Sequence, residues 1–270
     1  MSKTSGSRRK GPLAAARNLW RYRDLVGRMT ARNLKVKYKR SVLGFFWTLV
    51  NPLMTVTILV GIFSYVVRVE IEAYWAFLIS GYFVWNFLGQ TLSSATYVLR
   101  EYGQLSRAVS FPKEAPILAA ALSRLVEFTI EMVLVLVIVA VFRHGDLPAS
   151  FAWIPLLVVI QVLIGLGLAL PVATLAAFYH DVEHAIPILL TTLFYLSPVF
   201  YSADLVPESV RALYMLNPLA GLLTLFQSVI HEGQAPPPGL LLEVGVFSVM
   251  LLALGYTVFN RFEPLIAEVI

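Results

Sequence analysis

The chain has 270 residues, of which 58% are hydrophobic and 14% are charged, and it contains no cysteine. Soluble globular domains usually carry about 25% charged residues, so this composition excludes an ordinary soluble domain, and the missing cysteines exclude disulfides. The formal net charge is +5, and most of the 21 lysines and arginines precede residue 45.

The first 44 residues are expected to form a tail and an amphipathic helix at the membrane surface. The apolar stripe of that helix consists of Leu19, Tyr22, Val26, Met29 and Val36, with Asn33 as its polar member. The opposite side carries Arg21, Arg28, Arg32, Lys35 and Lys39. A helix of this kind lies in the interface and is attracted to anionic lipids. Residues 41–44, which include Ser41 and Gly44, are expected to form the corner before the first span.

The dense positive charge at the end of this helix has two readings. It serves only as a topology signal and lipid anchor, or it also binds a negatively charged substrate headgroup. The residues in the second reading are Arg32, Lys35, Lys37, Lys39 and Arg40. Nucleic-acid binding is disfavoured because the patch runs directly into a membrane span.

Long apolar segments predict an all-helical integral membrane protein, since about 20 apolar residues cross a bilayer. Six spans are expected, over residues 45–67, 73–99, 115–142, 147–179, 185–203 and 244–260. They form a membrane domain over residues 45–262, followed by a tail over residues 263–270. The concentration of Lys and Arg before the first span and in the 100–114 loop predicts that the N-terminus and this loop are cytoplasmic.

Residues 206–230 are expected to form a re-entrant helical hairpin that dips in from the outside. Pro218 removes a backbone donor and Gly221 weakens a helix, and such broken backbone is tolerated only inside protein or along a cavity. Six spans and a cytoplasmic C-terminus follow. The alternative, a seventh span in this region, is left open by hydropathy.

Three charged residues lie within the third expected span. Arg124, Glu127 and Glu131 follow spacings of three and four, so they share one helix face, and charges at membrane depth face the protein interior or a water-filled cavity. One reading pairs Arg124 with Glu127 and lets Glu131 bond a neighbouring helix. The other makes the three residues a polar lining or a proton relay.

The segment HDVEH places His180 and His184 four residues apart, near Asp181. Two such histidines on a helix can share a metal ion, but no third ligand lies nearby in the sequence. No metal site is therefore predicted, and the segment is expected to form a polar cytoplasmic turn.

Aromatic residues are concentrated in the second expected span. Tyr74 and Trp75 fit an interfacial aromatic belt, whereas Tyr82 and Trp85 lie deeper. Aromatic faces stack well on sugar rings, so all four are candidates for lining a carbohydrate channel.

Two energy and catalysis motifs are absent from the sequence. No segment matches the nucleotide-binding loop G-x-x-x-x-G-K-[ST] or the G-x-S-x-G elbow. Transport against a gradient would therefore take its energy from another chain or from an ion gradient.

Several segments resemble the permease subunits of ATP-binding-cassette exporters of lipid-linked polysaccharides, such as O-antigen and teichoic acid. The resemblance rests on ARNLKVKYKRSVLGFFWTLVNPLM, SSATYVLREYGQLSRAVSFPKEAPILAA, YLSPVFYSADLVPESVRALYMLNPLAGLLTLFQSVI and the final FEPLIAEVI. Their order and spacing cover most of the chain from about residue 20.

This resemblance implies a passage for glycan between two copies of the chain, driven by two separate ATPase subunits that bind ATP and Mg²⁺. It implies six spans per copy in the cytoplasmic membrane of a bacterium. The expected ATPase contacts are Gln104, Arg107, Phe111, Pro112, Lys113, His180 and Asp181. The corner at residues 41–44 would handle the pyrophosphate of a polyprenyl carrier, and no cofactor would be bound by this chain.

Two departures from the family pattern stand out. Gln227 occupies a position where relatives often have arginine, and the segment LSRAVS has one charge where many relatives have two. They put in doubt a headgroup role at position 227 and the details of the ATPase contact.

The sequence thus favours a permease for polyprenyl-pyrophosphate-linked polysaccharide that does no bond chemistry. One rival is a permease for drugs or small lipids with the same six-span plan. A second rival is a membrane enzyme acting on polyprenyl-linked sugars through Glu127, Glu131 or the His180 and His184 pair.

Overall fold

In the computed structural model, residues 21–39, 41–103, 111–144, 147–209, 214 and 217–269 are described. Across these residues the regular structure is helical throughout, as the sequence predicts. The longer helices are α2 (Arg23–Lys37), α3 (Trp47–Gly61), α4 (Tyr74–Glu101), α6 (Glu114–Phe142), α7 (Ile154–Phe178), α8 (Val182–Tyr195), α10 (Pro218–Gln227) and α11 (Pro238–Val269). Short 3₁₀ segments are η1 (Gly44–Phe46), η3 (Ala149–Trp153) and η4 (Ala203–Leu205), and π-helical turns are η2 (Ile62–Val67) and η5 (Ser228–Glu232).

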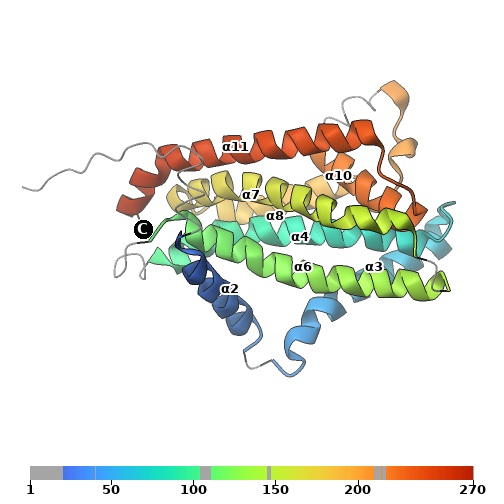
Figure 1. Cartoon of the computed structure of the whole chain (residues 1–270), viewed down its shortest axis with the longest axis horizontal. Coiled ribbons are helices and arrows are strands. Elements are labelled where there is room, and N and C mark those ends of the chain that lie inside the picture. The colour runs from blue at the N-terminus through green and yellow to red at the C-terminus, as the bar shows by residue number, and fades with distance from the viewer. Residues whose placement is uncertain are drawn as a thin grey trace, which may run out of the picture.

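The long helices run roughly along one axis, with α2 at one end of the bundle and α10 at the other (Figure 1). α4 lies at the centre, because α3, α6, α7, α8 and α10 all pack against it. Because it is surrounded by these helices, α4 is largely buried, and large side chains such as Leu78 and Phe83 are fully enclosed. We refer below to the α2 end and the α10 end of the bundle.

Four helical segments in the described residues are long and apolar enough to cross a membrane. They are Gly44–Val67, Glu114–Phe142, Ala149–Phe178 and Pro238–Ile266. The other two expected spans differ: α4 has 28 residues but carries Asn86, Gln90 and several hydroxyls, and α8 has only 14 residues. The six-span count therefore stays a prediction.

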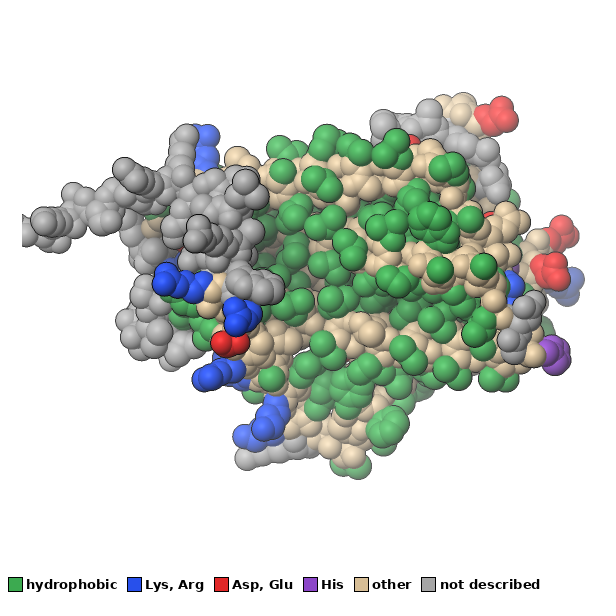
Figure 2. Space-filling view, viewed as in Figure 1, with side chains coloured by type: hydrophobic (Ala, Val, Ile, Leu, Met, Phe, Trp, Pro, Cys, Tyr) green, Lys and Arg blue, Asp and Glu red, His purple; other side chains and the backbone are tan. Residues whose placement is uncertain are grey.

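The surface has the banding expected of a membrane protein. Hydrophobic side chains cover the middle of the face in Figure 2, and charged side chains lie toward the two ends, with Lys and Arg prominent at the α2 end. Exposed apolar residues such as Ile58 and Val137 are normal for side chains that meet lipid or another chain.

The chain turns sharply between α2 and α3 at the corner predicted for residues 41–44. Gly44 has φ +53°, a left-handed conformation that costs glycine little. Its backbone N–H donates to the Ser41 hydroxyl oxygen at 3.2 Å. The turn aims α3 back along the bundle, so Trp47 begins a helix directly after the corner.

The backbones of α7 and α11 approach each other closely along a seam at Gly167 and Gly255. Pro171 lies inside α7, so the carbonyl of Gly167, four residues earlier, has no helical N–H to accept from. A side chain at Gly255 of α11 would overlap this carbonyl oxygen. The seam therefore requires glycine at both positions.

The predicted hairpin is described mainly in its second half. α10 begins at Pro218, where the Asn217 side chain accepts from the Leu219 N–H at 3.0 Å as a helix cap. It packs against α4, α7 and α11. Much of the first half, over residues 210–216, lies outside the described residues, so the re-entrant path stays a prediction.

Candidate functional site

The amphipathic helix α2 is attached to the bundle through α6. Val26 and Met29 are each 4% exposed, while Val36, at the end of the expected apolar stripe, is 57% exposed. The Thr30 hydroxyl donates to the Ala119 carbonyl at 3.4 Å, and the Ser123 hydroxyl donates to the Thr30 carbonyl at 3.3 Å. The helix thus rests on protein along its apolar side, with its positive side outward.

At the end of α2, a group of side chains converges on the carboxylate of Glu127. The Lys37 ammonium lies 2.9 Å and 3.0 Å from its two oxygens, and Arg124 Nη1 lies 2.8 Å from Oε2. The Tyr38 hydroxyl also donates to Oε1 and shares a hydrogen bond with Thr48. We call Lys37, Tyr38, Arg124 and Glu127 the charged cluster.

The charged cluster and its hydrogen-bond partners Thr48 and Gln90 connect four helices and the turn after α2. Lys37 ends α2, Arg124 and Glu127 lie on α6, and Thr48 lies on α3. Arg124 also donates to Gln90 Oε1 of α4 at 3.0 Å. Because Glu127 is only 3% exposed, its negative charge depends on these donors to remain stable away from water.

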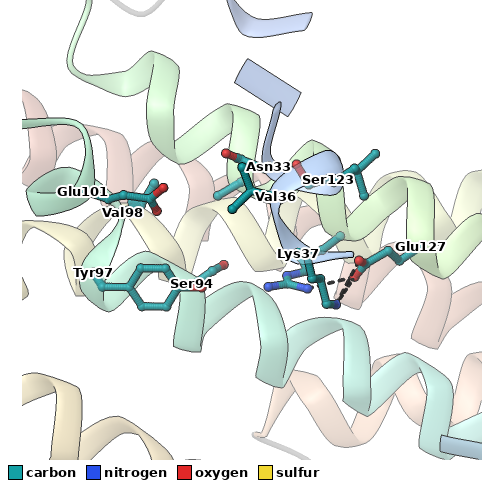
Figure 3. Close-up of a pocket in the computed structure, with 12 residues that line it drawn as sticks. Asn33, Val36, Lys37, Ser94, Tyr97, Val98, Glu101, Ser123 and Glu127 are labelled. Carbon is teal, nitrogen blue, oxygen red and sulfur yellow. Dashed lines mark hydrogen bonds and ion pairs between the residues drawn. The ribbon is translucent and has the colours of Figure 1, made fainter. Parts of the chain in front are cut away.

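A cavity of about 250 Å³ opens beside the charged cluster, between α2, α4 and α6. Figure 3 shows Lys37 and Glu127 on one side of it, with Tyr97 and Ser94 of α4 nearby. Its lining mixes charged, hydroxyl and apolar groups, and includes Asn33, Val36, Lys37, Ser94, Tyr97, Glu101, Ser123, Arg124 and Glu127. Such a lining suits an amphiphilic ligand with a charged headgroup.

Partial burial shifts the pKa values of Lys37 and Tyr38. Burial lowers the pKa of the Lys37 ammonium, and the positive charge of Arg124 lowers it further, while the nearby Glu127 carboxylate raises it. Burial and the bond to Glu127 raise the pKa of the Tyr38 hydroxyl, so Tyr38 remains a proton donor at neutral pH.

The expected headgroup cations occupy different environments. Arg32 lies 3.8 Å from Glu101 and 4.9 Å above the Tyr102 ring, and its side chain is 51% exposed. Lys35 and Lys39 are exposed, whereas Lys37 is committed to Glu127. Arg40 lies outside the described residues. The structure therefore divides the predicted patch into an exposed part and one residue that reaches into the bundle.

The three charges expected in the third span all point into the bundle. The pair between Arg124 and Glu127 is present, as one reading of the sequence predicted. Glu131 is 2% exposed, one turn deeper on the same face. Among the described residues, however, no hydrogen bond to a neighbouring helix is found for Glu131, so that part of the reading is not supported.

The four candidate channel aromatics pack against other aromatic side chains of the same chain. Tyr74 and Trp85 are 5% and 8% exposed, and the Tyr74 hydroxyl donates to the Phe200 carbonyl at 2.7 Å. Trp75 meets Phe142, and Tyr82 and Trp85 both meet Phe194. Trp75 and Tyr82 keep partial exposure, so they remain the better candidates for contact with a sugar.

The residues expected to contact an ATPase lie at the α2 end, as far as they are described. Phe111 is 9% exposed, Pro112 and Lys113 are half-buried, and His180 and Asp181 are exposed in the turn before α8. An ion pair between Arg100 of α4 and Glu183 of α8 links the two neighbouring helices. Gln104 and Arg107 lie outside the described residues.

The metal reading of the segment around His180 gains no support. His180 and His184 are both exposed, and no group of three or more potential ligands is found in the described part of the chain. A third ligand would be needed for a closed or catalytic site.

Sequence reasoning missed several residues that complete the sites. Tyr38, Thr48 and Gln90 were not singled out, because they contact the cluster only after α2 folds back on α6 and α4. A Tyr directly beside Lys37 was the one available signal. Gln227, noted only as a departure, is 5% exposed and donates from Nε2 to the Pro198 carbonyl at 2.7 Å.

Comparison with known families gives a match over most of the described fold. The family model described as "ABC-2 type transporter" matches residues 24–231. The matched region begins in α2 and ends in η5, so it includes the charged cluster, the cavity and α10.

Individual relatives extend this similarity over nearly the whole chain. The chain is 28% identical to the "O-antigen export system permease protein RfbA" of Klebsiella pneumoniae, over 92% of this chain and 95% of the relative. It is also 28% identical to the protein of the same name from Myxococcus xanthus, over 93% and 97% of the two chains. The "Polysialic acid transport protein KpsM" of Escherichia coli is 19% identical, over 86% and 91%.

Proposed function

Because the chain belongs to the ABC-2 type transporter family, whose members are membrane subunits of transporters, we propose that it is the permease of an ATP-driven exporter of cell-surface polysaccharide. The observation that carries this proposal is the similarity to O-antigen export permeases along more than nine-tenths of both chains. Similarity to a polysialic acid transport protein adds a second polysaccharide to the class.

The finer proposal concerns the substrate and its route. The substrate is a glycan carried on a polyprenyl pyrophosphate, whose anionic headgroup approaches the membrane at the α2 end. This is supported by the exposed cations Arg32, Lys35 and Lys39 and by the cavity between α2, α4 and α6. The corner at Ser41 and Gly44 adjoins this entrance, and the glycan passes toward the α10 end.

Two copies of the chain form the passage in this proposal. α3 and α8 both pack on α4, yet α8 buries only Ile186 and Leu190. Asn51 of α3 and Thr191 and Thr192 of α8 are exposed in apolar helices. An exposed amide in lipid is costly, so these faces fit a second copy or a water-filled passage better than acyl chains.

The energy comes from two ATPase subunits that bind ATP and Mg²⁺, and this chain supplies no nucleotide site. The ATPases contact the 100–114 loop and the turn at His180, at the end where Lys and Arg are concentrated. The positive-inside rule supports a cytoplasmic position for this end. In this proposal both termini lie on the cytoplasmic side of a bacterial cytoplasmic membrane that the chain crosses six times.

Deletion and reconstitution test the proposed function. Deleting the gene should remove the surface polysaccharide and leave its lipid-linked precursor inside the cell, and the wild-type chain should restore export. Purified chain with its ATPase should move lipid-linked glycan across vesicles only with ATP. A deletion strain with normal surface polysaccharide would contradict the proposal.

The two-copy arrangement has a separate test, because the chain has no cysteine. Thr191→Cys on α8 should cross-link to a second copy under oxidation, whereas Thr129→Cys on the exposed face of α6 should not. Both positions are exposed threonines whose hydroxyls bond their own helix, so the comparison isolates location. Equal cross-linking at both sites would indicate random collision.

A further inference from the structure

The charged cluster has the composition of an anion-binding site that is filled by a side chain of the protein itself. Glu127 accepts four hydrogen bonds, from Lys37 to both oxygens, from Arg124 and from Tyr38. A carboxylate has about four lone-pair positions, so its accepting capacity is fully used. Two cations and a phenol therefore meet a single negative group.

The two cations on the cavity wall are both ion-paired to one carboxylate. Of the charged residues that line the cavity, Lys37 and Arg124 share Glu127, while Glu101 is paired with Arg32 at the rim. Glu131, one turn deeper, interacts electrostatically with both cations, but it is buried and does not line the cavity. An added anion at the cavity wall would give Lys37 and Arg124 a second negative partner on the cavity side.

The cavity gives a small anion access to the two cations. The Lys37 side chain is 36% exposed, and Val36 and Tyr97 on the cavity lining are 57% and 44% exposed. Ser94, Ser123 and Asn33 add hydroxyl and amide groups to the same lining. An anion entering here would reach Lys37 and Arg124, which line the cavity, and not Tyr38 or Thr48, which do not.

A phosphate group satisfies this arrangement better than a carboxylate. It offers more acceptor oxygens, and arginine binds it in a bidentate manner while lysine binds it as a point charge. The position between α2 and two bundle helices, with apolar Leu34, Val36 and Val98 beside the charges, suits a phosphate attached to a lipid.

We propose that Lys37 and Arg124 form an exchangeable phosphate site, in which Glu127 holds the two cations until a lipid phosphate enters the cavity and takes over their hydrogen bonds. Glu127 then keeps the Tyr38 bond. Loading replaces the ion pair between Lys37 of α2 and Glu127 of α6, while the Tyr38 bond and the contacts at Thr30 keep the interface helix on α6. The proposal rests on the proposed function only in naming a lipid diphosphate as the main source of the phosphate.

A labelling experiment on the full chain tests the site. Val36→Cys introduces the only cysteine, on the cavity lining, and its reaction with N-ethylmaleimide is followed in phosphatidylcholine vesicles. Three arms add a polyprenyl diphosphate, phosphatidylglycerol, or inorganic pyrophosphate. Occupancy should slow labelling, and the arm that acts at the lowest amount identifies the source of the phosphate.

Variants added to Val36→Cys separate an exchangeable site from a structural lock. Lys37→Met and Arg124→Gln should abolish the slowing, whereas Arg28→Met, an exposed cation on the same helix, should not. Glu127→Gln removes the competing charge and keeps an acceptor oxygen, so half-maximal slowing should need at least about tenfold less lipid diphosphate, equal to about 1.4 kcal/mol.

The outcomes that overturn the proposal are distinct. Absence of slowing in every arm, slowing that survives Lys37→Met, or weaker binding in Glu127→Gln would each overturn it. If Glu127→Gln does not fold, the comparison of Lys37→Met with Arg28→Met still decides. Glycan export without any slowing would overturn the site and leave the proposed function intact, whereas slowing without glycan export would do the reverse.

Discussion

The helices at the two ends of the bundle are held in place by different kinds of bond. At the α2 end, the interface helix is tied to α6 by buried charges beside an open cavity. At the α10 end, neutral amides do this work: Asn217 donates to the Ser197 hydroxyl at 3.1 Å, and Gln227 donates to the Pro198 carbonyl at 2.7 Å. Around Gln227 the packing is tight, because a methyl group added at Gly81 would lie 3.1 Å from its Nε2.

Because of this difference, the ion pairs at the α2 end can exchange partners, whereas the amide hydrogen bonds at the α10 end cannot. A charged group can be released when another ion takes its place, since each ion only needs a suitable counter-ion. A buried neutral amide has no such substitute, and leaving its partner unsatisfied costs stability. The α2 end is therefore built for exchange and the α10 end for a fixed position of α10 against α4.

The largest effect is expected from removing the centre of the charged cluster. Glu127→Leu removes the carboxylate to which Lys37 and Arg124 are hydrogen-bonded, and breaking a buried pair in this way costs about 3–5 kcal/mol. Thermal unfolding of the purified chain, followed by tryptophan fluorescence, should show a large fall in Tm. Glu131→Leu is the matched control. It should leave Tm unchanged or raise it, because no hydrogen bond among the described residues offsets the cost of burying this carboxylate. Equal losses in both variants would contradict the assigned role of Glu127.

The next effect tests the close packing at the α10 end. Gly81→Leu would push against Gln227 and the Val199 carbonyl, and overpacking of this kind costs about 1–3 kcal/mol. Gly89→Leu on the same helix is the control, since nothing lies within 4 Å of a methyl group added there. Limited proteolysis of the α10 region should increase only in the Gly81 variant; unchanged digestion would argue against a fixed α10.

The neutral bond itself should contribute somewhat less. Gln227→Leu keeps most of the volume but leaves the Pro198 carbonyl without its donor, which costs about 1–3 kcal/mol. Gln234→Leu, at an exposed position, should change the unfolding midpoint little. The loss in Gln227→Leu should be independent of salt, and a salt-dependent loss would mean that charge, and not the amide, holds this end.

The smallest effect concerns the exposed pair at the rim of the cavity. Arg32 and Glu101 are 51% and 42% exposed, and such pairs contribute about 0.2–1 kcal/mol. Arg32→Gln should lower the unfolding midpoint slightly at low salt, and the difference from wild type should disappear near 1 M salt, where screening acts over about 3 Å. Persistence of the difference at high salt would favour the stacking of Arg32 on Tyr102 instead.

Sequence patterns predicted the parts of this molecule that depend on one helix at a time. The apolar segments predicted the all-helical fold, and the spacing of Arg124, Glu127 and Glu131 predicted a shared inward face, because both follow from helix geometry alone. The partner of Lys37 could not be predicted, since Glu127 lies 90 residues further along the chain. Contacts between distant segments depend on the angle that the corner at Gly44 sets between α2 and α3, and periodicity carries no information about that angle.

The same limit explains the aromatic residues and Gln227. Tyr74 and Trp85 fit a channel by residue type, and their positions on α4 bring Tyr74 against Phe200 and Trp85 against Phe194 of the same chain. Gln227 looked like a substitution in a headgroup site, but its surroundings give it a packing role. Residue type predicted which chemistry was available, and the arrangement of the helices decided where it is used.

The seam between α7 and α11 has a consequence for motion. The Gly167 carbonyl, freed by Pro171, faces the α-carbon of Gly255, an arrangement suited to a weak C–H···O contact. A helix bent at proline often acts as a hinge, but here the gap opened by the proline is filled by the backbone of the next helix. We therefore expect α7 and α11 to tilt together as one rigid lever, so that force applied at either end of the pair is transmitted along its full length.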